Sequence, residues 1–130
     1  MKHIAPWLAA LITMATAGAA GAQPYPAKPV RIVVGFAPGG GSDFIARVVA
    51  NKLTERFGSQ VIVENRPGAG STLGAEYVVK SPADGYTLLL SPASYTVNPS
   101  VYKLSFDPLG DITPIVQLSR GPYVVAVHPS

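Results

Sequence analysis

The sequence predicts an α/β domain built on a parallel sheet. Three short runs, at residues 30–36, 60–64 and 86–90, are rich in β-branched and other apolar side chains, as buried strands are. Helical patterns and glycine-rich loops lie between these runs. Strands that alternate with helices and short loops form parallel sheets through right-handed crossovers, so the order of elements along the chain indicates this fold class.

The first 22 residues are predicted to be a signal peptide and not part of the domain. Lys2 and His3 form a basic start, residues 4–17 are largely apolar, and the small residues 20–22 match a cleavage site before Gln23. The apolar run is shorter than a membrane-spanning helix needs. We therefore expect an exported, soluble mature protein; an uncleaved N-terminal anchor is the alternative.

The first predicted strand, 30–36, leads through a glycine-rich loop into a helix. Ser42 is expected to cap this helix, and Asp43 lies where the helix dipole favours a negative charge. Apolar residues then recur at helical spacing up to Phe57. Gly58 is expected to end the helix as its C′ residue.

The same unit of strand, glycine-rich loop and helix occurs a second time. The strand at 60–64 is followed by a loop at 65–74, and a helix is expected over about 71–80. The third strand, 86–90, leads into a loop at 91–102. In that loop we expect one or two helical turns and a break at the Asn98–Pro99 pair.

Two further apolar runs, 114–118 and 123–127, predict short strands near the end of the sequence. A parallel sheet needs both faces covered, and no helical pattern accompanies these runs. We therefore expect the sequence to be the front part of a longer protein. A small domain with an edge strand at its end, or a non-functional truncated product, are the alternatives.

Composition weighs against several functional classes. The sequence has ten Lys and Arg residues and seven Asp and Glu residues. These charged residues are spread singly and do not form the basic cluster that is typical of nucleic-acid binders. The absence of cysteine excludes disulfides, thiol nucleophiles and cysteine metal sites. The acidic residues show no metal-ligand spacing, so we expect neither a metal nor a cofactor.

The glycine-rich loops do not fit a nucleotide. The first loop matches the sequence motif of a phosphate-binding loop except at Gly41, which occupies the position of the motif's lysine. The dinucleotide fingerprint fails in both loops, because Phe44 and Leu73 occupy the position of its third glycine. Backbone amides and the hydroxyls of two such loops would suit a carboxylate. Tight turns between strand and helix explain the glycines equally well.

The sequence gives little support for a catalytic site. Ser42 lacks the surrounding G-x-S-x-G sequence of a hydrolase nucleophile. His128 is the only histidine after the predicted signal peptide, and no motif places a partner for it. We expect no catalytic residue and no enzyme; an exported α/β hydrolase that uses Ser42 is the alternative.

Six blocks come in one order along the chain. They are YPAKPVRIVV at 25–34, FAPGGGSD at 36–43, VENRPGAG at 63–70, ADGYTLL at 83–89, NPSVY at 98–102 and DITPI at 111–115. In this combination the chain resembles the Bug family, the extracytoplasmic solute receptors of tripartite tricarboxylate transporters. The resemblance covers essentially all of the predicted mature chain.

The resemblance implies a type II periplasmic-binding-protein fold, of which residues 23–115 would form a partial first lobe. Residues 116–130 would be a crossing strand toward a second lobe after Ser130. It also implies a monomeric periplasmic receptor that captures a carboxylate-containing small molecule and delivers it to membrane permease subunits, with no nucleic acid bound. Since a single lobe cannot close a cleft, we expect this chain alone to bind solute weakly or not at all.

The family's ligand-binding loops match three segments of this sequence. The implied ligand-binding residues are Pro38, Gly39, Gly40, Gly41, Ser42 and Asp43 in the first loop, Gly68, Ala69, Gly70, Ser71 and Thr72 in the second, and Ser91, Ser94 and Asn98 in the third.

Overall fold

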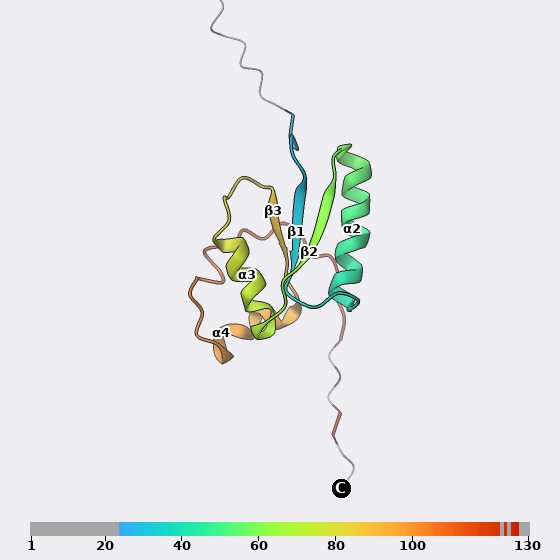
Figure 1. The fold of residues 1–130 in the computed structure, drawn as a ribbon. Helices are drawn as coiled ribbons and strands as arrows, with labels where there is room; N and C mark the ends of the chain where they lie inside the picture. Colours follow the sequence, from blue (N-terminus) through green and yellow to red (C-terminus); the bar gives the residue numbers. More distant parts are fainter. Residues whose placement is uncertain (1–23, 123, 125, 128–130) are drawn as a thin grey trace, which may run out of the picture.

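The computed structural model describes residues 24–122, 124, 126 and 127. Its centre is a parallel sheet in the order β2-β1-β3, with three strands: β1 (Val30–Val34), β2 (Val61–Asn65) and β3 (Thr87–Leu90) (Figure 1). The parallel sheet and all three of these strands were predicted, with bounds that differ by one or two residues. The predicted signal peptide lies outside the described residues.

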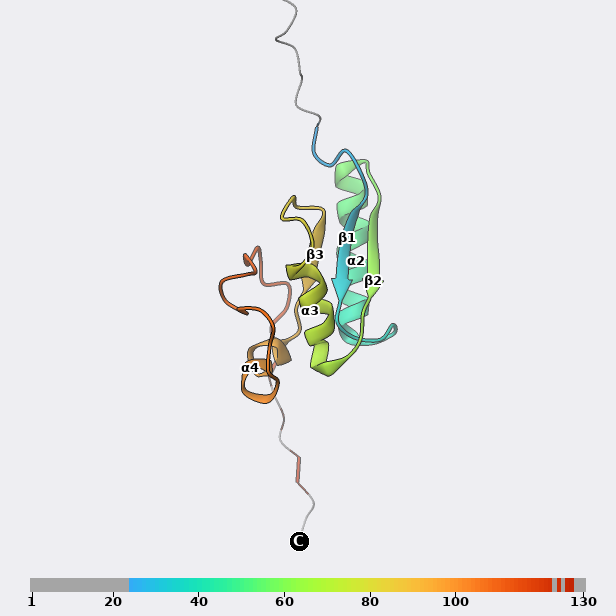
Figure 2. The same cartoon turned by 60° about the vertical axis from the view of Figure 1, so that its left-hand side comes forward.

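Two helices cover the sheet. α2 (Gly41–Phe57) packs against β1 and β2, and α3 (Thr72–Val79) packs against β1 and β3 on the other face (Figures 1 and 2). Alternate residues of β1, including Val30 and Ile32, pack in the core with Ala46 and Ala50 of α2. Val33 points the other way and is also fully buried. Burial of both faces explains why the run is apolar almost without interruption.

The ends of α2 are set by glycines. Gly40 is the N-cap with an extended backbone, and no side chain caps the helix. The prediction that Ser42 is the cap is therefore wrong: the helix begins at Gly41, and Ser42 lies inside its first turn. Gly58 adopts the left-handed conformation (φ 64°) and its N–H donates to the Thr54 carbonyl, which confirms the predicted end.

Short helical segments follow β2 and β3. The 3₁₀ turn η1 (Ala69–Ser71) precedes α3, and the turn η2 (Ala93–Thr96) precedes α4 (Asn98–Val101). Helical turns in this last segment were predicted, but the expected break at Asn98–Pro99 is wrong, because α4 begins there. Proline is tolerated in the first turn of a helix, where its missing N–H would have no partner.

The predicted strand at 114–118 is also wrong. These residues belong to no strand, and Ile115 and Val116 are 77% and 72% exposed. A β-branched run forms a strand only beside a partner, and no described strand pairs with this one. The run at 123–127 lies partly outside the described residues.

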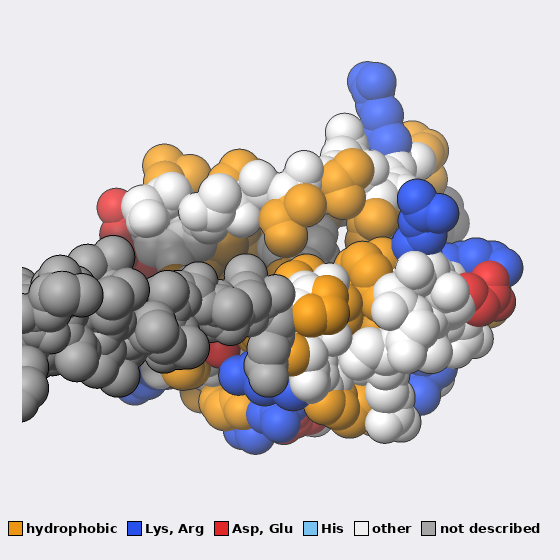
Figure 3. All heavy atoms as spheres, turned by 90° about the horizontal axis from the view of Figure 1, so that it is seen from above, with side chains coloured by type: hydrophobic (Ala, Val, Ile, Leu, Met, Phe, Trp, Pro, Cys, Tyr) orange, Lys and Arg blue, Asp and Glu red, His pale blue; other side chains and the backbone are white. Residues whose placement is uncertain are grey.

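The two ends of the sheet differ. Because the strands are parallel, their carboxyl ends share one edge, at the bottom of Figure 1, where α2 and α3 begin. Figure 3 shows the opposite end, where Lys and Arg side chains are dispersed among hydrophobic and uncharged ones. Within the described residues, no helix is long and apolar enough to cross a membrane.

Candidate functional site

Three loops meet at the carboxyl edge of the sheet: the first loop (35–40), the second loop (66–71) and the third loop (91–97). The chain moves from β1 to β2 on one side and then returns past β1 to β3 on the other. The strand order therefore reverses beside β1. In open α/β sheets, ligands bind outside the carboxyl ends of the strands at such a reversal.

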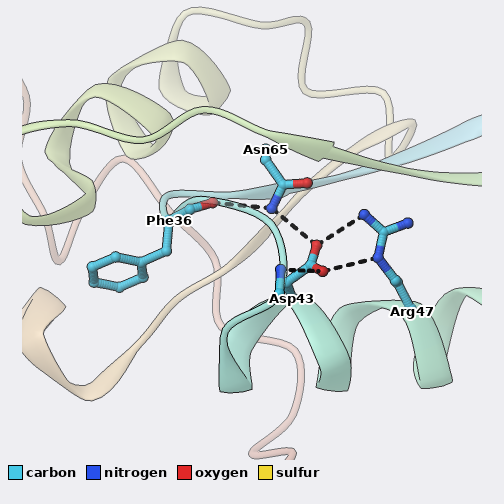
Figure 4. Close-up of polar contacts among 5 residues, drawn as sticks. Phe36, Asp43, Arg47 and Asn65 are labelled. Carbon is cyan, nitrogen blue, oxygen red and sulfur yellow. Dashed lines mark hydrogen bonds and ion pairs between the residues drawn. The ribbon is translucent and has the colours of Figure 1, made fainter.

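The first loop is held by the carboxylate of Asp43 (Figure 4). Asp43 accepts hydrogen bonds from the Gly39 N–H (3.0 Å), from the Arg47 guanidinium (2.9 and 3.0 Å) and from the Asn65 side-chain amide (3.0 Å). The same Asn65 nitrogen donates to the Phe36 carbonyl at 3.0 Å. The carboxylate thus joins the first loop, α2 and the end of β2.

These contacts also fix the charge of Asp43. The bonds from Arg47, then from the Gly39 N–H and from Asn65, hold the pKa of the Asp43 carboxyl well below its usual range. The side chain is 6% exposed. Its negative charge is therefore permanent near neutral pH and is balanced by Arg47 within the molecule.

The start of α2 presents backbone donors to this edge. The Phe44 N–H makes the first helical bond, to the Gly40 carbonyl at 3.0 Å. The amides before it, at Gly41, Ser42 and Asp43, have no partner within the helix because of helix geometry. With no side-chain cap, this turn offers N–H groups in a favourable positive potential to a bound anion.

The second loop has an unusual backbone. Four successive residues have positive φ: Gly68 (138°), Ala69 (45°), Gly70 (61°) and Ser71 (77°). Such angles are costly for residues other than glycine. Ser71 is 2% exposed and its hydroxyl lacks a hydrogen-bond partner among the described residues. Strain and an unsatisfied buried group together are typical of functional loops.

The second loop lies directly against the end of β1. A Cβ at Gly35 would lie 2.2 Å from the Cβ of Ser71, and a Cβ at Gly74 would lie 3.0 Å from the Cα of Gly35. Only glycine allows this approach. The two glycine-rich loops are therefore in contact.

Asn98, the first residue of α4, ties the end of the third loop to the second loop. Its buried side-chain amide donates to the Gly70 carbonyl at 2.8 Å and to the Thr72 hydroxyl at 3.2 Å. Ser94 has a buried hydroxyl with no partner among the described residues, whereas Ser91 is exposed. All three loops thus belong to one connected edge.

The residues expected to bind ligand fall into three groups. Six are exposed: Pro38, Gly39, Gly40, Gly41, Ala69 and Ser91. Four are half-buried: Ser42, Gly68, Gly70 and Ser94. Four are buried: Asp43, Ser71, Thr72 and Asn98. The last group supports the loops, since Asp43 and Asn98 direct their polar atoms at other protein groups.

Sequence reasoning missed three residues that shape the edge: Gly35, Arg47 and Asn65. A signal for Asn65 was present, because a polar residue that ends a buried strand lies at the ligand-binding edge of a parallel sheet. Arg47 follows Asp43 by four residues, a spacing that pairs opposite charges on a helix.

Two hollows differ in their position relative to this edge, because the second includes Tyr95 and Thr96 of the third loop in its lining. One of about 240 Å³ is at the other end of the sheet and includes Lys28, Arg31 and Tyr77 in its lining. Another, of about 230 Å³, is lined by Tyr95, Thr96, Pro99, Pro108 and Leu109. Among residues 24–122, 124, 126 and 127, no group of His, Cys, Asp and Glu could hold a metal ion.

Comparison with known proteins gives a consistent result. Residues 45–130 match the sequence model of a protein family, the tripartite tricarboxylate transporter family receptor. Protein BugT of Bordetella pertussis is 41% identical in an alignment of 128 residues. The alignment covers 91% of this chain and 38% of BugT. A UPF0065 protein of Pseudomonas sp. (strain P51) is 32% identical over 97% of this chain and 38% of its own length. The chain therefore spans little more than a third of these relatives.

Solved structures show the same likeness. The periplasmic binding protein BugD is 41% identical, with a TM-score of 0.64 over 67% of this chain and 29% of BugD. MatC from Rhodopseudomonas palustris, solved with bound malate, is 34% identical, with a TM-score of 0.60 over 69% of this chain and 31% of MatC. The predicted periplasmic-binding-protein fold class is confirmed, and the chain belongs to the tripartite tricarboxylate transporter receptor family.

Proposed function

We propose that this chain supplies one wall of a periplasmic receptor that captures a carboxylate-bearing small molecule for a membrane permease. The observation that carries the proposal is the carboxyl edge, where α2 begins without a side-chain cap beside two touching glycine-rich loops. MatC, a structural neighbour, holds malate. The first-loop and second-loop residues, with Ser91, Ser94 and Asn98, form or support this wall.

The chemistry of the wall suits a carboxylate bound by neutral donors. Arg47 is paired with Asp43. Arg66 is paired with Glu64, and its guanidinium stacks over the Tyr77 ring at 3.6 Å. Both guanidinium groups are therefore engaged within the protein. Backbone amides and hydroxyls remain to hold the anion, and such contacts favour reversible binding over a permanent ion pair.

We also propose that residues 23–115 act as a first lobe and that residues 116–130 lead toward a second. The described residues from 116 to 122 are exposed and belong to no helix or strand, and relatives such as BugT are more than twice as long as the chain. Closure of two lobes on a solute would report its presence to the permease. The receptor would work as a monomer and would need no cofactor.

A receptor performs no chemistry on its solute. The rival role, a hydrolase that uses Ser42, requires a general base next to its hydroxyl. Ser42 lies in the first turn of α2, and no histidine is present among the described residues. The solute-binding role is therefore the better supported of the two.

The role of the carboxylates is tested with a matched pair of solutes. Malate and its diamide share a carbon skeleton, but only malate is charged. We expect the purified chain to bind malate at least about tenfold more tightly than the diamide, because charged acceptors form the stronger hydrogen bonds. Equal affinity for the two would contradict the proposal, as would turnover of either solute.

A further inference from the structure

Asn65 joins three elements at the carboxyl edge, although it is not among the residues expected to bind ligand. It is the last residue of β2, and in the sheet it lies opposite Val34, the last residue of β1. Its side-chain nitrogen donates two bonds of 3.0 Å, one to the Phe36 carbonyl in the first loop and one to Asp43 in α2 (Figure 4). One amide group thus links β2 to the loop and to the helix.

Asp43 has no hydrogen-bonding capacity left for a solute. One carboxylate oxygen accepts from Asn65 and Arg47, and the other accepts from the Gly39 N–H and Arg47. Two oxygens offer about four acceptor positions, so these four bonds fill them. The side chain is also only 6% exposed. Its contribution to binding must therefore come through the loop that it holds.

The first loop needs such support. Gly39 has a φ of 89°, and glycine occupies three successive positions from Gly39 to Gly41. A glycine segment loses more conformational entropy than any other when it is fixed in one shape. Among the described hydrogen bonds, the bond from the Gly39 N–H to Asp43 is the only one that these three glycine amides donate.

We infer that Asn65 and Asp43 are positioning residues that hold the first loop ready for an anion. The Asn65 amide fixes Asp43 and the Phe36 carbonyl, and Asp43 fixes the Gly39 N–H beside the free amides at the start of α2. A loop ordered before binding does not lose that entropy when the solute arrives, so affinity rises without a new contact. This inference rests on the proposed function for its consequence in binding, but the ordering of the loop is a separate property.

The test compares two substitutions that act on the same strand. Asn65→Ala removes both side-chain bonds at the end of β2. Thr54→Val is the matched control, because the Thr54 hydroxyl accepts a 3.0 Å bond from the Val61 N–H at the start of β2, far from the first loop. Both variants lose support for β2, but only Asn65→Ala affects the first loop.

Amide hydrogen exchange and malate titration are then measured on the 130-residue chain. We expect Gly39 to exchange about tenfold faster in Asn65→Ala, and the malate affinity to fall by a similar factor, as for the loss of one or two hydrogen bonds. In Thr54→Val both quantities stay at wild-type values. Asn65→Ser, which keeps one donor, gives an intermediate exchange rate and supplies the same test should the alanine variant not fold.

The outcomes separate the inference from the proposed function. Unchanged exchange at Gly39 in the Asn65 variants, or an equal increase in Thr54→Val, overturns the inference. Faster exchange with unchanged malate affinity overturns the positioning role. Faster exchange in a chain whose wild-type form binds malate and its diamide equally well supports the ordering of the loop and contradicts the proposed function.

Discussion

Asp43 shows how a single side chain can be understood from sequence only in part. Its place in the first turn of α2 predicts a favourable interaction with the helix dipole, and the residue does lie in that turn. Its bonds to Gly39 and Asn65 could not be predicted, because they depend on how the first loop and β2 fold onto the helix. Asn65 is 22 residues away in the chain.

Asp43 leads to a prediction about pH. Its carboxyl has a lower pKa in the folded protein than in the unfolded chain, where the value is about 4. The unfolded state therefore takes up a proton first as the pH falls, and the stabilisation from Asp43 is lost progressively below about pH 4 to 5. In Asp43→Asn this contribution is absent at every pH.

Urea unfolding of both proteins between about pH 7 and pH 2 checks this prediction. The wild type should exceed Asp43→Asn in stability by a constant amount near neutral pH, and the difference should shrink as the pH falls below about 4. A difference that stays the same down to pH 2, or that grows, would show that the carboxylate is not the source.

At the scale of elements, the strands and the main helices were predictable because each has a continuous local pattern. The apolar run of β1 and the helical spacing from Gly41 to Phe57 are examples. The start of α4 and the exposed run at 114–118 were not predictable in this way. The first depends on a proline accommodated in a first turn, and the second on whether a partner strand lies beside it.

The contact between the first and second loops is another feature that sequence patterns do not reveal. Glycines in both loops were predicted to bind ligand or to make tight turns, but Gly35 has a third role. It leaves room for Ser71, whose Cβ would clash with any side chain at that position. Close approach of two backbones is a property of the packed elements and not of either loop alone.

Gly35→Ala should therefore be severely destabilising. A Cβ 2.2 Å from that of Ser71 forces the second loop to move, and we expect a loss of about 3 kcal/mol in the free energy of unfolding. Gly41→Ala is the control, since a Cβ there meets no atom within 4 Å, and it should change stability by less than about 1 kcal/mol.

A double variant identifies the cause. Ser71→Gly removes the Cβ that Gly35→Ala would strike, but the Cα of residue 71 would still lie 2.7 Å from the new Cβ. The pair should therefore recover part of the loss, and not all of it, in denaturant unfolding. If the double variant is as unstable as the two single losses added together, the clash with the Ser71 Cβ is not the reason.

At the scale of the whole molecule, the two ends of the sheet offer different chemistry. The carboxyl edge has neutral donors from three loops, held by Asp43 and Asn98. The opposite end has a hollow lined in part by Lys28 and Arg31, in which Lys28 is paired with Asp84. A carboxylate could in principle be drawn to positive side chains at this second place, so the position of a bound solute decides between the two ends.

The most direct test is to map malate onto the chain by its effect on the backbone amide signals in NMR. Binding at the carboxyl edge predicts shifts concentrated at residues 39–42 and 68–72, with the weak, millimolar affinity expected of one wall of a cleft. Signals at 28–31 and 84–87 should stay in place. Shifts confined to those latter residues would contradict the account.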